Sequence, residues 1–153
     1  RNAMEKLHGH PFFVNLFYTF QDSFHLFFVM SYARRGELLT YISKLRGFNN
    51  ETTQFYTSEI VSAIEYMHSI CIIHRDLKPE NILLNENYHI MITDFGTSKF
   101  LDPSSQTHDN NLIIDSSFVG TCQYVSPELL IEKKICKRHY FLLNSVLIYG
   151  RLV

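Results

Sequence analysis

Tryptophan is absent from this sequence of 153 residues, and cysteine is scarce. The three cysteines, Cys71, Cys122 and Cys136, are far apart and form no C-x-x-C pair. An odd number of dispersed cysteines argues against a disulfide framework and favours a reducing compartment. We therefore expect the protein to be cytoplasmic.

A long hydrophobic run and a surplus of charge are also missing. The longest apolar stretch, residues 140–149, is interrupted by Asn144 and Ser145 and is far shorter than the roughly 20 residues of a membrane-spanning helix. Lys plus Arg number 14 and Asp plus Glu number 15, so the formal net charge is −1. Without a basic surplus there is no general electrostatic argument for nucleic acid or an anionic membrane as a partner. We expect neither a membrane span nor a nucleic-acid partner.

Aromatic residues are abundant by contrast, with 13 Phe and 9 Tyr. The length suits about one domain with a substantial core. Residues 12–20 are aromatic and β-branched, which predicts a buried strand, and residues 24–32 predict a second strand. The turn-forming residues between them, Gln21-Asp22-Ser23, indicate that the two strands form a hairpin.

Helical patterns follow the predicted hairpin. Apolar residues in the stretch 38–45 recur at helical spacing, and the helix they predict ends near Gly47. A longer helix is predicted over residues 51–67, with Asn50 as its N-cap. Beyond it we expect short strands at 81–84 and 89–93, a long polar loop over 97–117, and a short helix that opens at Pro127. The mixture predicts the α+β class.

Three short motifs carry the chemistry. Residues 74–81, H-R-D-L-K-P-E-N, match the pattern H-R-D-L-x-x-x-N at every fixed position. Asp94-Phe95-Gly96 follows 13 residues after Asn81, and Ser126-Pro127-Glu128 is a variant of A-P-E. One tripeptide alone would be a weak signal, but three in this order predict a site for phosphoryl transfer.

The residue types suit that reaction. Phosphoryl transfer depends on positioning and charge neutralisation more than on covalent chemistry. Asp76 would accept the proton of the substrate hydroxyl, and Lys78 would reach the transferring phosphate. Asn81 and Asp94 would supply a neutral and an anionic oxygen ligand to Mg²⁺, which prefers such hard ligands together with nucleotide phosphates.

Simpler explanations compete with these assignments. A lone H-R-D tripeptide is better explained as a surface charge cluster, but Asn81, Asp94 and Glu128 in the right order favour the catalytic interpretation. His8 and His10 could bind a metal ion. Because no cysteine or carboxylate cluster accompanies them, a solvent-facing turn is the favoured explanation.

On these motifs the chain resembles the AGC group of eukaryotic Ser/Thr protein kinases, from about residue 10 to residue 137. The resemblance also rests on HPFFV at 10–14, SYA at 31–33, GELL at 36–39, SFVGT at 117–121 and QYVSPE at 123–128. It implies a partial protein kinase-like fold. Residues 1–30 would be the end of the small β lobe, 31–36 the hinge, and 37–153 the first half of the helical lobe, divergent after about residue 138.

The resemblance also implies a nucleotide site. Ser31 and Ala33 would bond the adenine edge through backbone atoms at the hinge. Glu37 would approach the ribose, and Leu83 would form the floor under the adenine. Glu80 and Asp94 complete the residues that the resemblance assigns to ATP.

A regulatory loop is implied in the same way. Ser117 matches the activation-loop phosphorylation site, and Arg75 and Lys99 would be the cationic partners of its phosphate. Thr121 would hydrogen-bond near Asp76 and shape the acceptor site.

Several parts of the family pattern have no counterpart here. The six glycines are isolated, so there is no G-x-G-x-x-G loop, and no V-A-I-K lysine precedes the hairpin. Lys6 lies too close to the hairpin to replace that lysine. Tyr140 and Leu142 stand where the family has Asp and Trp, and the lipid-binding pleckstrin-homology domain is absent. We therefore expect a fragment or an erroneous gene model.

The resemblance implies transfer of the ATP γ-phosphate to Ser or Thr of protein substrates, the activation loops of other AGC kinases, in intracellular signalling. Two alternatives stay open. One is a non-catalytic, truncated or pseudokinase-like module that holds nucleotide or partners. The other is a chain that does not fold stably alone, because its aromatic residues 12–32 would be exposed.

Overall fold

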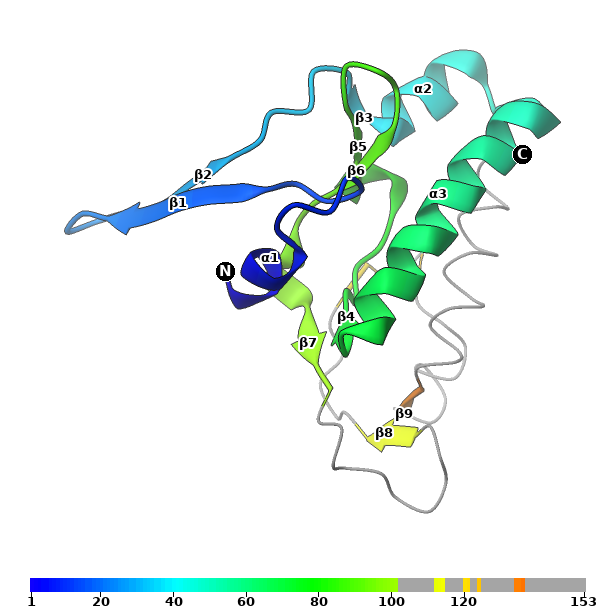
Figure 1. The fold of residues 1–153 in the computed structure, drawn as a ribbon. Coiled ribbons are helices and arrows are strands. Elements are labelled where there is room, and N and C mark those ends of the chain that lie inside the picture. Colours follow the sequence, from blue (N-terminus) through cyan, green and yellow to red (C-terminus); the bar gives the residue numbers. More distant parts are fainter. Residues whose placement is uncertain (102–111, 115–119, 122–123, 125–133, 137–153) are drawn as a thin grey trace.

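The computed structural model describes residues 1–101, 112–114, 120–121, 124 and 134–136, and the statements below concern these residues (Figure 1). The helices are α1 (Asn2–Leu7), α2 (Leu38–Leu45) and α3 (Asn50–Ser69), with 3₁₀ turns η1 (Pro79–Asn81) and η2 (Phe95–Thr97). The strands are β1 (Leu16–Gln21), β2 (Leu26–Met30), β3 (Gly36–Glu37), β4 (Ile72–Ile73), β5 (Ile82–Leu84), β6 (Ile90–Ile92), β7 (Lys99–Phe100), β8 (Leu112–Ile114) and β9 (Lys134–Cys136). The predicted α+β class is confirmed.

The strands form four small antiparallel sheets. β1 pairs with β2, β4 with β7, and β8 with β9, while β3, β5 and β6 form a three-stranded sheet in that order. The helix α3 packs along β4 and β6. Within the described residues, none of the helices is both long and apolar enough to cross a membrane.

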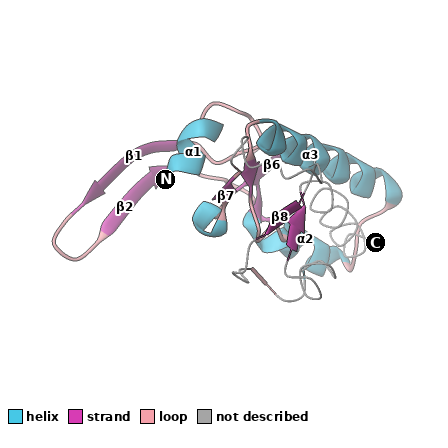
Figure 2. Cartoon of the chain, turned by 90° about the horizontal axis from the view of Figure 1, so that it is seen from below, coloured by secondary structure: helices cyan, strands magenta, loops and turns pink. Residues whose placement is uncertain are grey.

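The hairpin of β1 and β2 is present as predicted and projects away from the other elements (Figures 1 and 2). The expectation that its first strand is buried is wrong. Only Leu16 is buried in β1, and every residue of β2 is exposed. Tyr18 is 71% exposed and Phe24 at the turn is 90% exposed. The reason is that no described element covers either face of this two-stranded ribbon.

Residues 12–15 form the base of the hairpin rather than part of its first strand. The Val14 amide donates to the Ile92 carbonyl at 3.0 Å, and the Ile92 amide donates to the Phe12 carbonyl at 2.8 Å. These bonds draw the chain toward β6 before β1 begins, and Phe13 becomes fully buried between them. The hairpin is thereby tied to the strand that leads to Asp94.

The two longer helices lie close to their predicted positions. α3 begins at Asn50, and its N-cap is Asn49 rather than Asn50. Asn49 has the extended backbone that a cap requires, and its side chain accepts a hydrogen bond from the Thr52 amide at 2.9 Å. α2 ends at Leu45, and Arg46 follows in the left-handed region with φ 58°.

Apolar side chains from the three α-helices, β4, the three-stranded sheet and the segment before β1 form one core. Its largest fully buried members are Phe13, Leu7, Leu38, Ile60, Met67, Ile72, Ile73, Ile82, Leu84, Ile90 and Ile92. The core therefore lies directly behind the segments 74–82 and 92–96, where the sequence motifs fall.

The predicted loop over 97–117 is partly wrong. It contains the end of η2, the strand β7, and β8, which pairs with β9. β7 forms because its partner β4 comes from the buried run before His74, with Ile72 opposite Phe100 and Ile73 opposite Lys99. The helix predicted at Pro127 and the motif 126–128 lie outside the described residues.

Candidate active site

Short strands on both sides hold the H-R-D segment in place. β4 ends immediately before His74. η1 begins immediately after Lys78 and is followed directly by β5. β6 then runs back beside β5 and ends just before Thr93 and Asp94. The Thr93 amide donates to the Asn81 carbonyl at 3.0 Å, which brings the ends of the two motifs together.

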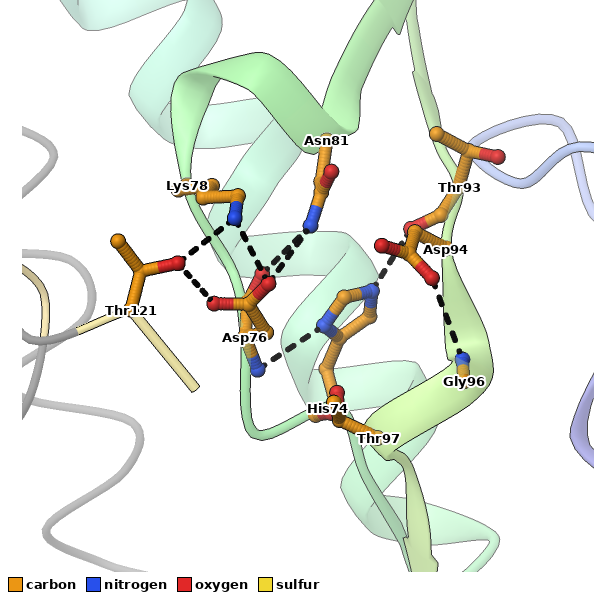
Figure 3. Close-up of polar contacts among 9 residues, drawn as sticks. All are labelled: His74, Asp76, Lys78, Asn81, Thr93, Asp94, Gly96, Thr97 and Thr121. Atoms are coloured by element: carbon orange, nitrogen blue, oxygen red, sulfur yellow. Dashed lines mark hydrogen bonds and ion pairs between the residues drawn. The ribbon is translucent and has the colours of Figure 1, made fainter. Parts of the chain in front are cut away.

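The Asp76 carboxylate is the centre of a compact hydrogen-bond cluster (Figure 3). Its Oδ1 accepts from the Thr121 hydroxyl at 2.7 Å, and its Oδ2 lies 2.9 Å from the Lys78 ammonium. The Asn81 amide nitrogen donates to the Asp76 carbonyl at 2.9 Å and to Oδ2 at 3.3 Å. Lys78 also donates to the Thr121 hydroxyl at 2.7 Å. Lys78 and Asn81 from the same loop and Thr121 from 45 positions further along the chain thus meet at one carboxylate.

Electrostatics keep this carboxylate ionised. Burial alone would raise the pKa of Asp76, but the hydrogen bond and charge of Lys78 and the hydroxyl of Thr121 lower it below its usual value. The same contact with Asp76 raises the pKa of Lys78, against the smaller opposing effect of burial. At neutral pH the site therefore contains an ion pair.

The His74 side chain links the H-R-D segment to the segment that precedes Asp94. Its Nδ1 accepts a hydrogen bond from the Asp76 amide at 3.3 Å, so Nε2 carries the proton and donates to the Thr93 carbonyl at 2.8 Å. The ring of Phe95 lies at 5.1 Å between centroids, and Phe13 lies beyond it at 6.1 Å. Full burial lowers the pKa of His74, although the Thr93 carbonyl and the nearby carboxylates act in the opposite direction. The imidazole is a neutral spacer between the loops.

The burial of His74 predicts how the free energy of unfolding depends on pH. Because its pKa is lower in the folded chain than in the unfolded one, the unfolded chain binds the proton first as pH falls below about 6.5. The free energy of unfolding should fall as the pH drops below that value, by up to about 1.4 kcal/mol per pH unit. Urea unfolding at pH 7.5 and 5.5 measures the slope. The His74→Gln variant keeps a donor but cannot titrate, so it should show a shallower slope; equal slopes would contradict the assignment.

Asp94 occupies an unusual backbone position. Its φ of 60° and ψ of 68° are left-handed, and its Oδ1 accepts from the Gly96 amide at 3.4 Å. The residue is exposed and borders a hollow of about 400 Å³ that is also lined by Phe28 and Met30 of β2. Lys6 does not reach this hollow, because its ammonium lies 5.0 Å from the centre of the Phe100 ring beside a different hollow.

The donor set fits a magnesium ion with nucleotide phosphates. The amide nitrogen of Asn81 is held by Asp76, so its oxygen is the atom left for a cation. Asp94 adds an exposed carboxylate one residue beyond the Thr93–Asn81 backbone bond. One amide and one carboxylate suit Mg²⁺, which completes its shell with water and phosphate oxygens. Among the described residues there is no cluster of three or more His, Cys, Asp or Glu side chains suited to a metal.

The residues assigned to the adenosine part of the nucleotide lie on β3, β5 and the segment before them, away from Asp94. Glu37 lies opposite Leu83 in the pairing of β3 with β5, and the Arg35 amide donates to the Leu84 carbonyl at 3.0 Å. The hinge segment is thereby attached to the predicted adenine floor. Ser31, Ala33, Glu37 and Leu83 do not line the hollow beside Asp94.

Ser31 and Ala33 are fixed by backbone bonds. The Ser31 amide donates to the Asn15 carbonyl at 2.9 Å, and its hydroxyl accepts from the Asn15 amide at 3.0 Å. Ala33 is buried, and its carbonyl accepts from Gly36 at 3.2 Å. The predicted hinge backbone is therefore bonded to Asn15 at Ser31 and closed on itself between Ala33 and Gly36.

Glu80 has an unsatisfied carboxylate oxygen. Its Oε2 is buried and has no hydrogen-bond partner among the described residues. Buried acceptors are nearly always paired, so an orphaned one in a candidate site indicates a donor that a ligand supplies. This observation supports a ligand site beside η1.

Gly120 is a site residue whose role the sequence analysis missed. Its φ is +127°, and a Cβ there would lie 2.6 Å from the Arg75 carbonyl oxygen. Only glycine permits this approach, which places the neighbouring Thr121 against Asp76. The G-T pair after a polar loop is a signal that could have revealed it.

The variant Gly120→Ala should therefore destabilise the chain and displace Thr121. We expect a loss of roughly 1–3 kcal/mol in the free energy of unfolding, from strain and the clash together. Gly9→Ala is the matched control, because Gly9 has φ +85° but nothing within 4 Å of its Cβ position. Urea unfolding of both variants separates backbone strain from the clash, and equal losses would show that the approach to Arg75 does not matter.

The predicted regulatory residues are only partly described. The Arg75 Nε donates to the Thr97 carbonyl at 2.5 Å, and Lys99 follows two residues later in β7. Both side chains are half-buried and belong to the same end of the β4–β7 pair. Ser117 lies outside the described residues.

His10 differs from the expected solvent-facing turn. The residue is half-buried, and its ring stacks on Tyr66 of α3 with 4.1 Å between centroids. Burial lowers the pKa of this imidazole. The aromatic partner on α3 holds the ring against the helix, which the local sequence could not indicate.

Comparison with known proteins identifies the class. Residues 1–140 match the family described as the protein kinase domain. The chain therefore belongs to the protein kinase domain family, and the predicted kinase-like fold is confirmed. Members of this family transfer phosphate from ATP to protein substrates with a divalent metal ion.

Particular relatives are Ser/Thr protein kinases. Human 3-phosphoinositide-dependent protein kinase 1 is 61% identical over 137 residues, which cover 90% of this chain and 24% of that protein. The human putative 3-phosphoinositide-dependent protein kinase 2 is 60% identical over 90% of this chain and 33% of its own length. Serine/threonine-protein kinase ppk21 of Schizosaccharomyces pombe is 46% identical over the whole chain and 28% of its own length. The chain thus spans 24% to 33% of the length of these curated relatives. The resemblance to AGC-type Ser/Thr kinases is confirmed.

Proposed function

We propose that this chain carries the catalytic and metal-binding loops of a Ser/Thr protein kinase that transfers the γ-phosphate of ATP to other kinases. The observation that carries the proposal is the cluster in which Thr121, Lys78 and Asn81 meet the Asp76 carboxylate. Its substrates would be Ser or Thr residues in activation loops of other AGC kinases. The name of serine/threonine-protein kinase ppk21 and Lys78 in the catalytic loop support Ser or Thr as the acceptor.

The Asp76 carboxylate is the group that would receive a substrate hydroxyl. Its present donors are the hydroxyl and backbone of Thr121, the Lys78 ammonium and the Asn81 amide. An incoming Ser or Thr would replace one of these donors, and Asp76 would orient the substrate oxygen toward the γ-phosphorus and take its proton as the new P–O bond forms and ADP leaves.

Lys78, together with Asn81 and Asp94 through the metal ion that they would hold, would neutralise the negative charge of the nucleotide phosphates. Lys78, held between Asp76 and Thr121, would stabilise negative charge on the transferring phosphoryl group. Asn81 and Asp94 would hold Mg²⁺, which neutralises phosphate charge when bound. The unpaired Oε2 of Glu80 would accept a donor from the bound substrates.

The nucleotide base would lie at the hinge. Ser31 and Ala33 would bond its edge, Glu37 would approach the ribose, and Leu83 would support the ring from β5. After phosphorylation, Ser117 would pair with Arg75 and Lys99. We place this activity in the cytoplasm, which the dispersed cysteines support.

Nucleotide binding by the 153-residue chain tests the proposal. A fluorescent ATP analogue should bind at least about tenfold more tightly with Mg²⁺ than without it, because the Asn81 amide oxygen and the Asp94 carboxylate would coordinate the ion. Asp94→Asn replaces the only carboxylate of the pair with a neutral amide and should abolish that difference. Equal affinity with and without Mg²⁺ in the parent chain would contradict the proposal. Binding with Mg²⁺ but no transfer in a completed kinase domain would favour the non-catalytic module.

A further inference from the structure

A buried carboxylate lies outside the catalytic cluster, in the middle of α3. Glu59 is only 8% exposed, and both of its oxygens accept hydrogen bonds. The His89 Nδ1 lies 2.5 Å from Oε1, and the Ile90 amide donates to Oε2 at 3.0 Å. An acid in a core helix is costly to bury unless it is paired, so the His89 and Ile90 donors are what make this burial tolerable.

The donors come from the turn between β5 and β6. His89 is half-exposed at the surface, and its ring lies 5.6 Å from that of Phe55 on α3. Ile90 is the first residue of β6 and is fully buried. Tyr56 lies one turn before Glu59 on α3. Burial raises the pKa of Tyr56, and the negative charge of Glu59 raises it further, with weaker effects from Tyr41 and Tyr88. Glu59 thus anchors the start of β6 to α3 through a side-chain and a backbone donor.

The other end of β6 is the metal-binding segment. The strand ends at Ile92, and Thr93 and Asp94 follow directly. Thr93 is bonded to Asn81 through its amide and to His74 through its carbonyl. A strand advances about 3.3 Å per residue, so four residues separate the anchor from Asp94 by roughly 13 Å. A slip of β6 at Ile90 would move Asp94 relative to Asn81.

We propose that Glu59 is a positioning residue, which holds the start of β6 against α3 and thereby fixes Asp94 beside Asn81. This inference rests on the proposed function for its effect on Mg²⁺, but not for the anchoring itself. Packing alone does not account for the carboxylate. An apolar residue would fill the same space, whereas only an acceptor fixes the register of the Ile90 amide and the His89 ring.

The test uses pairs of variants on the 153-residue chain. Glu59→Ala removes the acceptor, whereas Glu59→Gln keeps an acceptor for the Ile90 amide, and the other His89 tautomer can accept from its amide nitrogen. His89→Leu and His89→Asn form a second pair at a half-exposed position, where loss of folding is not expected; Asn retains a donor near Nδ1. Glu65→Ala is the control, because Glu65 is an exposed carboxylate on the same helix.

Two measurements separate positioning from stability. Hydrogen exchange of the amides over 93–96 should accelerate about tenfold in Glu59→Ala and His89→Leu and stay near the parent rate in Glu59→Gln, His89→Asn and Glu65→Ala. The Mg²⁺ concentration for half-maximal binding of the ATP analogue should rise about tenfold in the first two variants, with nucleotide affinity in the absence of Mg²⁺ unchanged.

The outcomes distinguish this inference from the proposed function. If the parent chain shows no Mg²⁺-dependent binding, the proposed function fails, and the exchange data alone decide whether Glu59 anchors the segment. Unchanged exchange over 93–96 in both Glu59→Ala and His89→Leu would overturn the inference. If Glu59→Ala and Glu59→Gln lose the same exchange protection over 93–96, the charge of Glu59 matters and its hydrogen-bond geometry does not. That result would also overturn the inference.

Discussion

Phosphate transfer to a peptide by the 153-residue chain alone is expected to remain at the level of an Asp76→Ala control. The sequence contains no glycine-rich loop and no lysine in the place that would hold the nucleotide phosphates. Each such electrostatic contact supplies several kcal/mol in the transition state. Since about 1.36 kcal/mol corresponds to a tenfold change in rate, two missing contacts should cost roughly 10⁴-fold or more.

The assay is incorporation of radiolabelled phosphate from ATP into a Ser-containing peptide, measured side by side for the parent and Asp76→Ala. Addition of Mg²⁺ and a high ATP concentration removes weak binding as the cause of a negative result. Incorporation clearly above the control would contradict this expectation. It would mean that a cation of the chain itself replaces the missing lysine, and Lys6 is unsuited to that role because it lies against Phe100.

A second large effect is expected in a completed kinase domain. We consider a chimera in which the preceding small-lobe segment and the rest of the helical lobe come from human 3-phosphoinositide-dependent protein kinase 1. Asp76→Asn keeps the shape of the side chain but removes its negative charge and its ability to accept the substrate proton. Loss of a general base typically lowers kcat by about 10²–10⁴-fold, and we expect a loss in that range.

Steady-state kinetics of this chimera separate the base from a structural role. kcat should fall while KM for ATP changes little, because Asp76 contacts Lys78, Asn81 and Thr121 rather than the hinge. Thr121→Val is the informative control, since it removes one hydrogen bond to Asp76 but leaves the carboxylate. A parallel rise in KM for ATP, or a kcat close to that of the parent, would argue against Asp76 as the base.

Local patterns in the sequence predicted a large part of this architecture. Helical spacing placed α2 and α3 to within a few residues, and the H-R-D-L-x-x-x-N pattern predicted which residues could meet at one carboxylate. These features are local: a helix face repeats every few residues, and a loop of eight residues carries its own spacing. The displacement of the α3 cap from Asn50 to Asn49 shows the limit, because two adjacent asparagines are equivalent until the backbone angles are known.

Long-range contacts were beyond the reach of the sequence. The bond between Glu59 and His89 joins residues 30 positions apart, and no periodicity indicates it. The role of Gly120 depends on the approach of its backbone to Arg75, which becomes visible only when both segments are placed. The predicted burial of the first strand is wrong for a related reason, since apolar residues indicate a buried strand only where another element covers them.

The projecting hairpin also determines how the chain behaves at high concentration. Its apolar side chains are exposed on both faces, and a net charge of −1 provides little electrostatic repulsion between molecules near neutral pH. We therefore expect low colloidal stability, because the open backbone edges of the ribbon offer sites for intermolecular strand pairing. Dilute samples at mildly alkaline pH, where the molecules carry more negative charge, are the conditions under which this chain should stay dispersed.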